Sequence, residues 1–235
     1  MFNYTYLKSD FKQIAREPIM LLFALLSLLL IPVFKLLVLY VLPVIGRYTY
    51  FDVMAYYPYM LVLVYLLQPM MFGTVMGFFM LDEKDAHIFE LLRVTPLGVS
   101  GYLSNRLLLP VVMASVYAFI GWLVLGTSVH GFSQLLWVIL FTACQTILYG
   151  LFIAMVSKDK VQGLTYAKGV SVVMVFGFVD LFKSPIVSKI GLLFPQYYVS
   201  LAVGNQGLIQ MFMGLVVNVL WVILVLKWSM TTLGE

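Results

Sequence analysis

The sequence predicts an all-α integral membrane protein with six transmembrane helices. Of its 235 residues, 63% are hydrophobic and only 10% are charged, whereas charged residues make up about 25% of an ordinary soluble domain. A soluble fold of this length would lack the polar residues to cover its surface, so lipid is the expected solvent for the excess apolar side chains. Residues 1–235 then form a single transmembrane domain with short loops.

The segment 1–18, before the first long apolar run, predicts a helix that lies in the membrane surface. Four apolar residues recur there at near-helical spacing, namely Phe2, Tyr6, Phe11 and Ile14. Charged residues fall between them, and such an amphipathic helix buries its apolar face among the lipid headgroups. Pro18 disfavours a helical conformation in the residue before it, so the chain is expected to turn into the bilayer there. A frayed basic tail is the alternative.

Six apolar runs are predicted to cross the membrane. They cover residues 19–42, 57–80, 107–126, 135–156, 169–179 and 208–226. The first run is longer than the apolar core of a signal peptide, which indicates an anchor that stays in the membrane. The fifth run is short, because its helix would reach only about 16–21 Å, against a hydrocarbon core of roughly 30 Å. It spans the bilayer only if flanking residues extend it.

Residues 183–206 cannot form one continuous spanning helix. Prolines and glycines interrupt them at Pro185, Gly191, Pro195 and Gly204. The segment is predicted to form short helices that dip into the outer interface before the sixth span. Such irregular backbone is tolerated at membrane depth only where protein or a water-filled cavity satisfies it, which makes the segment a candidate re-entrant gate. The candidate gate residues are Pro195, Tyr197 and Tyr198. An ordinary wet loop is the alternative.

Loop cations predict the orientation in the membrane. If the N-terminus is cytoplasmic, ten cations lie inside, namely Lys8, Lys12, Arg16, Lys84, Arg93, Arg106, Lys158, Lys160, Lys168 and Lys227. Three then lie outside, namely Arg47, Lys183 and Lys189. Cytoplasmic loops carry the excess of Lys and Arg, so both termini are expected to be cytoplasmic. The small net charge of +4 lies in these loops, which favours contact with anionic membrane lipid and argues against nucleic acid as a partner.

Two ionisable residues lie within or beside the predicted spans. Lys35 is well inside the first, where a cation costs about 2.5–3.5 kcal/mol at the bilayer centre on insertion scales. It either faces a transport path or snorkels toward the outer headgroups, and snorkelling is the preferred interpretation. Asp180 stands three residues before Lys183, a spacing that lets the two pair on one helix face at the end of span five. A role for Asp180 in releasing cargo is the minority alternative.

No catalytic or metal-binding motif is recognisable. The chain has no G-x-x-x-x-G-K-[ST] sequence, so it lacks the loop with which ATPases hold phosphates. It has no H-E-x-x-H motif, and its two histidines, His87 and His130, fall on opposite sides of the membrane in this topology. We therefore expect neither enzyme activity, nor a metal, nor a cofactor in this chain. The apolar, Met-rich and aromatic spans suit a hydrophobic or amphipathic cargo.

The longest polar interruption, residues 81–106, predicts a cytoplasmic amphipathic helix. Asp82 can cap it, Glu83 and Asp85 suit its first turn, and Pro96 closes it. A helix over 82–96 at the membrane face would offer a charged surface to a partner. An interfacial helix without a partner is the alternative.

The run LDEKDAHIFELLRVTPLGVSGYLSNRLL, residues 81–108, resembles the segment between the second and third spans of type-2 ATP-binding-cassette permeases. FKQIAREP, residues 11–18, and LLFPQYYVSLA, residues 192–202, are similar to that family's leading helix and outer re-entrant region. Ala86-His87 depart from the glycine that many members place after the acidic cluster.

The resemblance implies the six-span permease subunit of an exporter, with a coupling helix docked on a separate ATPase subunit that binds ATP and Mg²⁺. It gives docking roles to Glu83, Lys84, Glu90 and Arg93. It also implies a second permease subunit, in a homodimer or a related heterodimer. The expected function is ATP-driven export of a hydrophobic or amphipathic drug, lipid or peptide. The alternative is a non-transporting membrane scaffold or sensor with the same docking helix.

Overall fold

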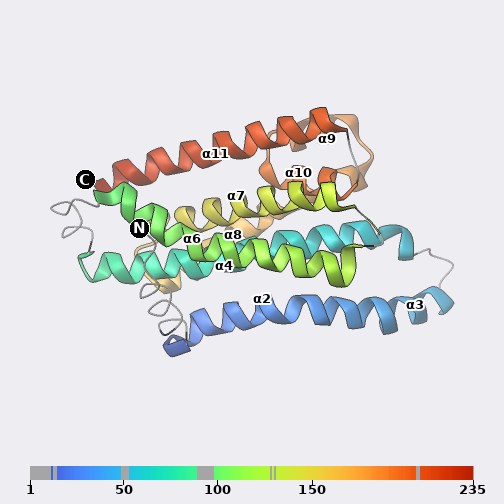
Figure 1. The fold of residues 1–235 in the computed structure, drawn as a ribbon, viewed down its shortest axis with the longest axis horizontal. Helices are drawn as coiled ribbons and strands as arrows, with labels where there is room; N and C mark the ends of the chain where they lie inside the picture. Colours follow the sequence, from blue (N-terminus) through green and yellow to red (C-terminus); the bar gives the residue numbers. More distant parts are fainter. Residues whose placement is uncertain are drawn as a thin grey trace.

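The computed structural model describes residues 15–48, 53–88, 98–127, 131–204 and 207–234, together with the single residues 12 and 129. Every regular element of these ranges is helical. Six helices are long and apolar enough to cross a membrane, and the main ones run side by side along the long axis of the molecule (Figure 1). The predicted all-α, six-span architecture is therefore confirmed for the described part of the chain.

The first span is longer than predicted. It consists of α2 (Pro18–Leu36), the π-helical turn η1 (Leu37–Val41) and α3 (Leu42–Tyr48). Pro18 occupies the first turn of α2, and Glu17 before it is extended, with φ −99° and ψ 111°, as expected for a residue preceding proline. Most of the predicted surface helix over 1–18 lies outside the described residues.

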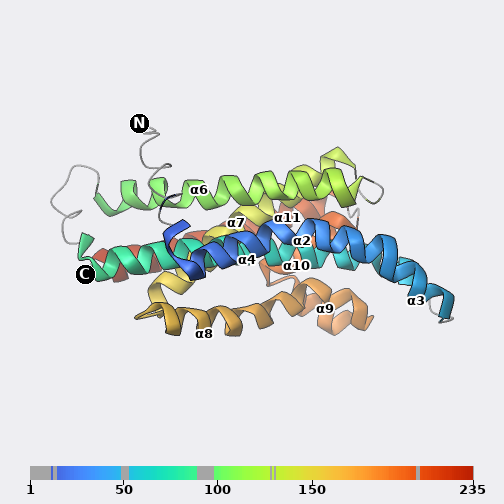
Figure 2. The ribbon, with the colours of Figure 1, turned by 90° about the horizontal axis from the view of Figure 1, so that it is seen from below.

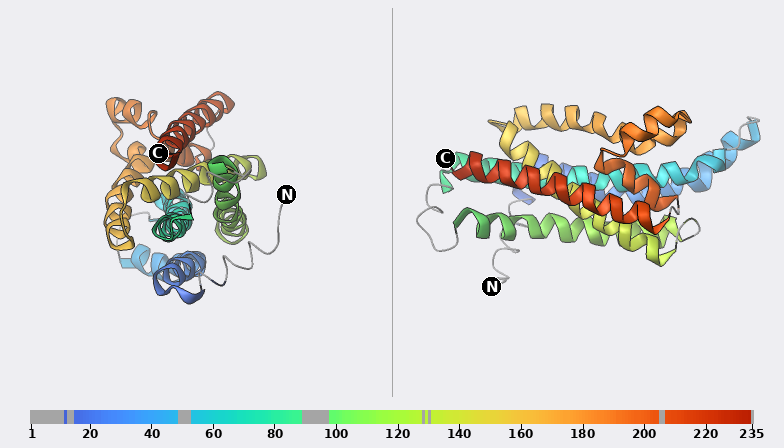
Figure 3. Two further views of the ribbon diagram at one scale, coloured as in Figure 1. Left: turned by 90° about the vertical axis from the view of Figure 1, so that its left-hand side faces the viewer. Right: turned by 90° about the horizontal axis from the view of Figure 1, so that it is seen from above.

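Helix α4 (Tyr57–Asp85) follows the short 3₁₀ turn η2 (Val53–Tyr56) and forms the centre of the bundle. In its most apolar stretch 78% of the residues are buried, whereas the value for the first span is 11%. It packs against α2, α6, α7, α8 and α10, and the end-on view in Figure 3 shows it enclosed by these neighbours. A helix that is apolar all round is expected at such a position.

The remaining long helices pack around α4 and α7. Helix α6 (Gly98–Gly121) continues into the π turn η3 (Trp122–Gly126), and α7 (Phe132–Val156) packs directly on α4. Helix α11 (Leu208–Gly234) forms the last span. Figure 2 shows α6 and α8 on opposite sides of the bundle.

Three glycines let the backbones of α4 and α7 come into direct contact. A Cβ atom on Gly73 would lie 2.8 Å from the carbonyl oxygen of Thr146, and one on Gly77 would lie 3.0 Å from that of Gly150. A Cβ on Gly150 would in turn lie 3.0 Å from the carbonyl oxygen of Gly73. The pair Gly73 and Gly77 forms a G-x-x-x-G motif, which is typical of close helix contacts in membranes. Our sequence interpretation missed this signal.

The predicted shortness of the fifth span is wrong. Helix α8 (Lys160–Ser171) and the 3₁₀ helix η4 (Val172–Phe182) form one stretch of 23 residues. At the usual rises of these helices it is roughly 40 Å long, which is ample for a bilayer. The extension lies in the polar residues before 169. Asp159 starts α8 by accepting a hydrogen bond from the backbone nitrogen of Gln162 at 2.7 Å, so Lys168 belongs to this span and not to a loop.

The start of the predicted helix over 82–96 is also wrong. Asp82, Glu83 and Asp85 belong to the last turns of α4, and the chain leaves this helix through His87, whose φ is +54°. Asp82 therefore does not cap a new helix. Residues 89–97, with the remainder of the predicted helix, lie outside the described residues.

The segment between the fifth and sixth spans consists of two short helices, as predicted. Helix α9 (Pro185–Gly191) and helix α10 (Pro195–Val203) each begin with proline in the first turn, and their axes are bent by 112°. We call them the bent pair. All nine residues of α10 are buried, and it contacts α4, α7, α11 and η4.

Candidate functional site

An ion pair joins α4 to α6 at the end of the bundle where α4 finishes. The guanidinium of Arg106 donates two hydrogen bonds to the carboxylate of Glu83, one of them from Nε to Oε2 at 3.0 Å. The hydroxyl of Tyr102 donates to the same carboxylate. The Arg106 Cζ atom also lies 4.7 Å from the centroid of the Phe79 ring. We call Glu83, Tyr102 and Arg106 the α4–α6 clamp.

The clamp is largely removed from water. The side chains of Arg106 and Glu83 are 12% and 15% exposed. Two parallel hydrogen bonds between guanidinium and carboxylate form one of the stronger polar contacts in proteins. Helix α4 ends just before residues 86–97, and α6 begins just after them. The clamp therefore holds these two helices together where that segment joins the bundle.

Lys160 ties two further helices to the same end. Its Nζ atom lies 2.9 Å from Oε2 of Glu17, just before α2, and 2.8 Å from Oδ1 of Asp82, in α4. The start of α8 is thus joined to α2 and α4. Together with the clamp, Lys160 connects α2, α4, α6 and α8 around the base of the segment 86–97.

The four predicted docking residues have different places in the structure. Glu83 points inward to Arg106, and Lys84 is exposed at the end of α4. Glu90 and Arg93 lie outside the described residues. The sequence interpretation missed the partners Tyr102 and Arg106, because they lie 19 and 23 residues from Glu83 and their pairing depends on how α4 and α6 are rotated.

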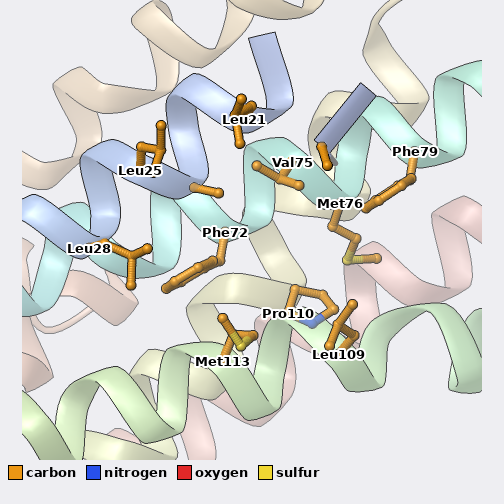
Figure 4. Close-up of a pocket in the computed structure, with 12 residues that line it drawn as sticks. Leu21, Leu25, Leu28, Phe72, Val75, Met76, Phe79, Leu109, Pro110 and Met113 are labelled. Carbon is orange, nitrogen blue, oxygen red and sulfur yellow. The ribbon is translucent and has the colours of Figure 1, made fainter. Parts of the chain in front are cut away.

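An apolar cavity of about 220 Å³ lies between α2, α4 and α6. Figure 4 shows side chains from these three helices around it. The lining includes Leu25, Phe72, Met76, Phe79, Leu109 and Met113. Because Phe79 also contacts Arg106, the cavity adjoins the α4–α6 clamp.

The predicted gate residues lie at the opposite end and are packed. The carbonyl oxygen of Pro195 accepts a hydrogen bond from Nε2 of Gln145 at 3.2 Å, deep in α7. The hydroxyl of Tyr198 donates to the carbonyl oxygen of Leu192 at 2.9 Å, across the break of the bent pair. The hydroxyl of Tyr197 donates to Oδ1 of Asp180 at 2.7 Å. The contacts of Pro195 and Tyr197 fasten the bent pair to α7 and η4, and that of Tyr198 joins its two helices.

Asp180 does not pair with Lys183, and Lys35 contacts a backbone carbonyl group. Among the ion pairs between described side chains, none joins Asp180 to Lys183. The backbone of Lys183 is left-handed, with φ +49°, so Lys183 has left the helix face that carries Asp180. The ammonium of Lys35 donates to the carbonyl oxygen of Val124 at 3.2 Å. Val124 lies in η3, toward the end of the bundle that holds the bent pair.

Comparison with known proteins places the chain in a family. A family profile described as fluoroquinolones export permease protein Rv2686c-like matches residues 10–226. A search of curated proteins and a search of solved structures each found no match. The family match covers the first five spans and most of the sixth, and it agrees with the resemblance of residues 81–108 to type-2 ATP-binding-cassette permeases. The chain therefore belongs to the Rv2686c-like fluoroquinolone export permease family, and it is a multi-pass membrane permease of the ATP-binding-cassette type-2 exporter class.

Proposed function

We propose that this chain exports hydrophobic or amphipathic drugs with energy from a separate ATPase subunit, which binds ATP and Mg²⁺ and docks on residues 82–96. The observation that carries the proposal is the position of α4. This helix leads from the docking segment straight into the centre of the bundle, where it contacts five other helices. The part of α4 that follows its internal Pro69 runs without interruption to Asp85, so displacement of the exposed end would be passed along this buried part to the centre of the bundle.

The α4–α6 clamp makes the docking segment act on two helices at once. Since Glu83 and Arg106 join the helices on either side of the segment, an ATPase that pulls on it moves α4 and α6 together. The apolar cavity beside the clamp provides room for this movement. Its wall includes Met76 and Met113, and methionine side chains adapt readily to a changing cavity shape.

The bent pair serves as the re-entrant outer element in this proposal. Hydrogen bonds from two spans hold its break in place. Nε2 of Gln145 donates to the carbonyl oxygen of Pro195, and Nε1 of Trp221 donates to the carbonyl oxygen of Leu193 at 3.0 Å. Gln145 and Trp221 each follow the first residue of their helix by thirteen positions, or about 20 Å of helix. The break would then lie near the middle of the bilayer if these helices begin at the outer surface.

The orientation predicts which single cysteines react from outside. In a variant whose only native cysteine, Cys144, is replaced by alanine, a cysteine at Lys183 should react with an impermeant maleimide on intact cells. A cysteine at Lys158 should react only after the cells are opened. Both side chains are exposed, so access to solvent does not differ between them. Labelling of position 158 from outside would contradict cytoplasmic termini.

Docking of the ATPase predicts a charge-reversal effect at the exposed end of α4. Lys84→Glu should reduce co-purification of the ATPase at least tenfold, because reversing a charge at an interface replaces attraction by repulsion. Glu90→Lys should act in the same way. Glu83 is unsuitable for this test, since its reversal would break the clamp. Lys189→Glu, an equally exposed change at the opposite end, is the control and should leave recovery unchanged. Full recovery with Lys84→Glu and Glu90→Lys would rule out this docking surface.

A further inference from the structure

A further cavity lies at the end of the bundle where α4 begins. It has a volume of about 270 Å³ and lies between the first two turns of α4, the end of η4 and the last turns of α10. The start of α4 and the bent pair lie at this same end (Figure 1). We call the cavity the outer pocket, because this end faces outward in the proposed orientation. The described residues that line it are Pro58, Tyr59, Val62, Asp180, Ser200, Leu201, Val203 and Gly204.

Asp180 lines the outer pocket with one carboxylate oxygen already engaged and the other open. Its Oδ1 atom accepts hydrogen bonds from the hydroxyls of Tyr197 and Ser188, at 2.7 and 3.4 Å, and these fix the orientation of the carboxylate. No described residue donates to Oδ2. In the described part of the chain, the fully buried side-chain atoms without a partner all belong to other residues. Oδ2 therefore keeps accessible surface and can accept a hydrogen bond from a ligand.

The hydroxyl of Ser200 is a second polar group in the wall with capacity to spare. The residue as a whole is only 8% exposed. Its Oγ atom makes no hydrogen bond to a described residue and is not among the fully buried unpaired atoms of the described chain. The hydroxyl thus keeps accessible surface in the pocket, where it can accept a hydrogen bond beside that of Asp180.

The charge of the outer pocket is one-sided. Asp180 is the only charged residue among the described residues that line it, and no ion pair in the described part of the chain joins Asp180 to a cation. Lys183 lies nearby in sequence, but its left-handed backbone has taken it off the helix face of Asp180. A carboxylate away from bulk water is costly unless it is paired. A cationic ligand would supply the missing charge.

The end of α10 adds to the preference for a cation. Leu201, Val203 and the C-terminal cap residue Gly204 line the outer pocket. The last carbonyl groups of a helix carry the negative end of its dipole and favour positive charge within about one turn. The lining also includes the aromatic ring of Tyr59, and a tyrosine ring attracts a cation placed over its face. Three independent features of the wall therefore favour the same charge.

We propose that the outer pocket binds the protonated amino group of a cargo molecule before the cargo is released outward. An inorganic ion is a poor fit, because Ca²⁺ takes six to eight oxygen ligands, whereas the described lining offers one carboxylate. An alkyl- or arylammonium group needs fewer polar partners and fills the remaining space with carbon, which suits the walls formed by Pro58, Val62 and Leu201. This inference names the cargo chemistry of the proposed export function and rests on it.

Binding of benzylamine, which is protonated at neutral pH, to the purified permease in dodecyl maltoside micelles tests the pocket. Equilibrium dialysis against empty micelles at fixed ionic strength corrects for partition, and benzyl alcohol provides a neutral ligand of the same shape. We expect saturable binding of benzylamine that is about tenfold tighter, or more, than that of benzyl alcohol, since hydrogen bonds between charged groups are the stronger ones. Asp180→Asn should abolish this preference.

Asp85→Asn is the matched control. It removes the same charge from an exposed residue at the opposite end of α4, so the preference for the amine should be unchanged. Asparagine at position 180 keeps the shape of the side chain and an oxygen for Tyr197. If Asp180→Asn nevertheless fails to fold, Ser200→Ala is the second test, and we expect it to weaken benzylamine binding about threefold.

A further arm separates cargo from lipid, because the headgroup of phosphatidylethanolamine carries the same ammonium chemistry. Adding this lipid to the micelles should leave benzylamine binding within about twofold of its value. Displacement of benzylamine by the lipid would assign the pocket to a headgroup and overturn the proposal. Equal binding of benzylamine and benzyl alcohol by wild type, or a preference that survives in both pocket variants, would also overturn it. Since no ATPase is present, these outcomes would not bear on ATP-driven export.

Discussion

Leucine at position 77 is expected to prevent stable packing of α4 against α7. The first added atom alone would lie 2.9 Å from two carbon atoms of Ile153 and 3.0 Å from the carbonyl oxygen of Gly150. The backbone of α7 cannot move aside without separating the two helices, and this contact is the most extensive one in the bundle. Overpacking of a well-packed core costs about 1–3 kcal/mol, and we expect Gly77→Leu to reach at least the upper value.

The measurement is the yield of monodisperse permease after solubilisation and its midpoint of thermal unfolding. Gly169→Leu is the control, since an added Cβ at Gly169 in α8 would meet no heavy atom within 4 Å. We expect Gly77→Leu to yield little monodisperse protein, and Gly169→Leu to behave like wild type. Equal yield and midpoint for both variants would show that the close α4–α7 contact is wrong.

Removing one partner of the α4–α6 clamp is expected to destabilise the protein more than removing both. Glu83→Ala removes the carboxylate that accepts two hydrogen bonds from the largely buried guanidinium of Arg106, and breaking such a pair typically costs about 3–5 kcal/mol. In Glu83→Ala with Arg106→Met the charge is gone and an apolar side chain lies beside Phe79. The double variant should therefore recover a large part of the stability that Glu83→Ala alone loses.

A double-mutant cycle on chemical unfolding in mixed micelles measures this coupling. We expect an interaction free energy of about 2 kcal/mol or more between Glu83 and Arg106. Asp85→Ala is the control, because Asp85 is exposed in the same turn of α4 and exposed charges contribute about 0–1 kcal/mol. Strictly additive effects of the Glu83 and Arg106 replacements would mean that the clamp does not hold the helices together.

The architecture was predictable from the sequence because it is set mainly by which segments are apolar enough to lie in lipid. The six apolar runs must lie in lipid, and Pro18, Pro185 and Pro195 limit where helices can begin, so five spans and the bent pair were predicted close to their observed places. The fifth span was underestimated. Its first half contains Lys160 and Lys168, and hydropathy alone does not show that Asp159 starts a helix there.

Most of the candidate site was not predictable in this way. Glu83 was assigned to an outward docking face, whereas it turns inward to Arg106, because the polar run continues α4 instead of starting a new helix. Asp180 pairs with Tyr197 instead of Lys183. These contacts depend on how packed helices are rotated and how deep they lie. The spacing of residues within one helix does not determine either. By contrast, the G-x-x-x-G motif at Gly73 and Gly77 was visible and could have predicted the α4 contact surface.

Drug transport by sealed vesicles tests the central claim most directly. The permease is reconstituted with the ATP-binding-cassette ATPase that co-purifies with it, and accumulation of a fluoroquinolone is measured in inside-out vesicles with ATP, without ATP, and with an ATPase variant that cannot hydrolyse it. We predict accumulation only when the permease, the active ATPase and ATP are all present, and we predict its loss with Lys84→Glu. Equal drug movement without ATP, or ATPase capture without any drug movement, would contradict ATP-driven export, and capture alone would identify the chain as a membrane scaffold.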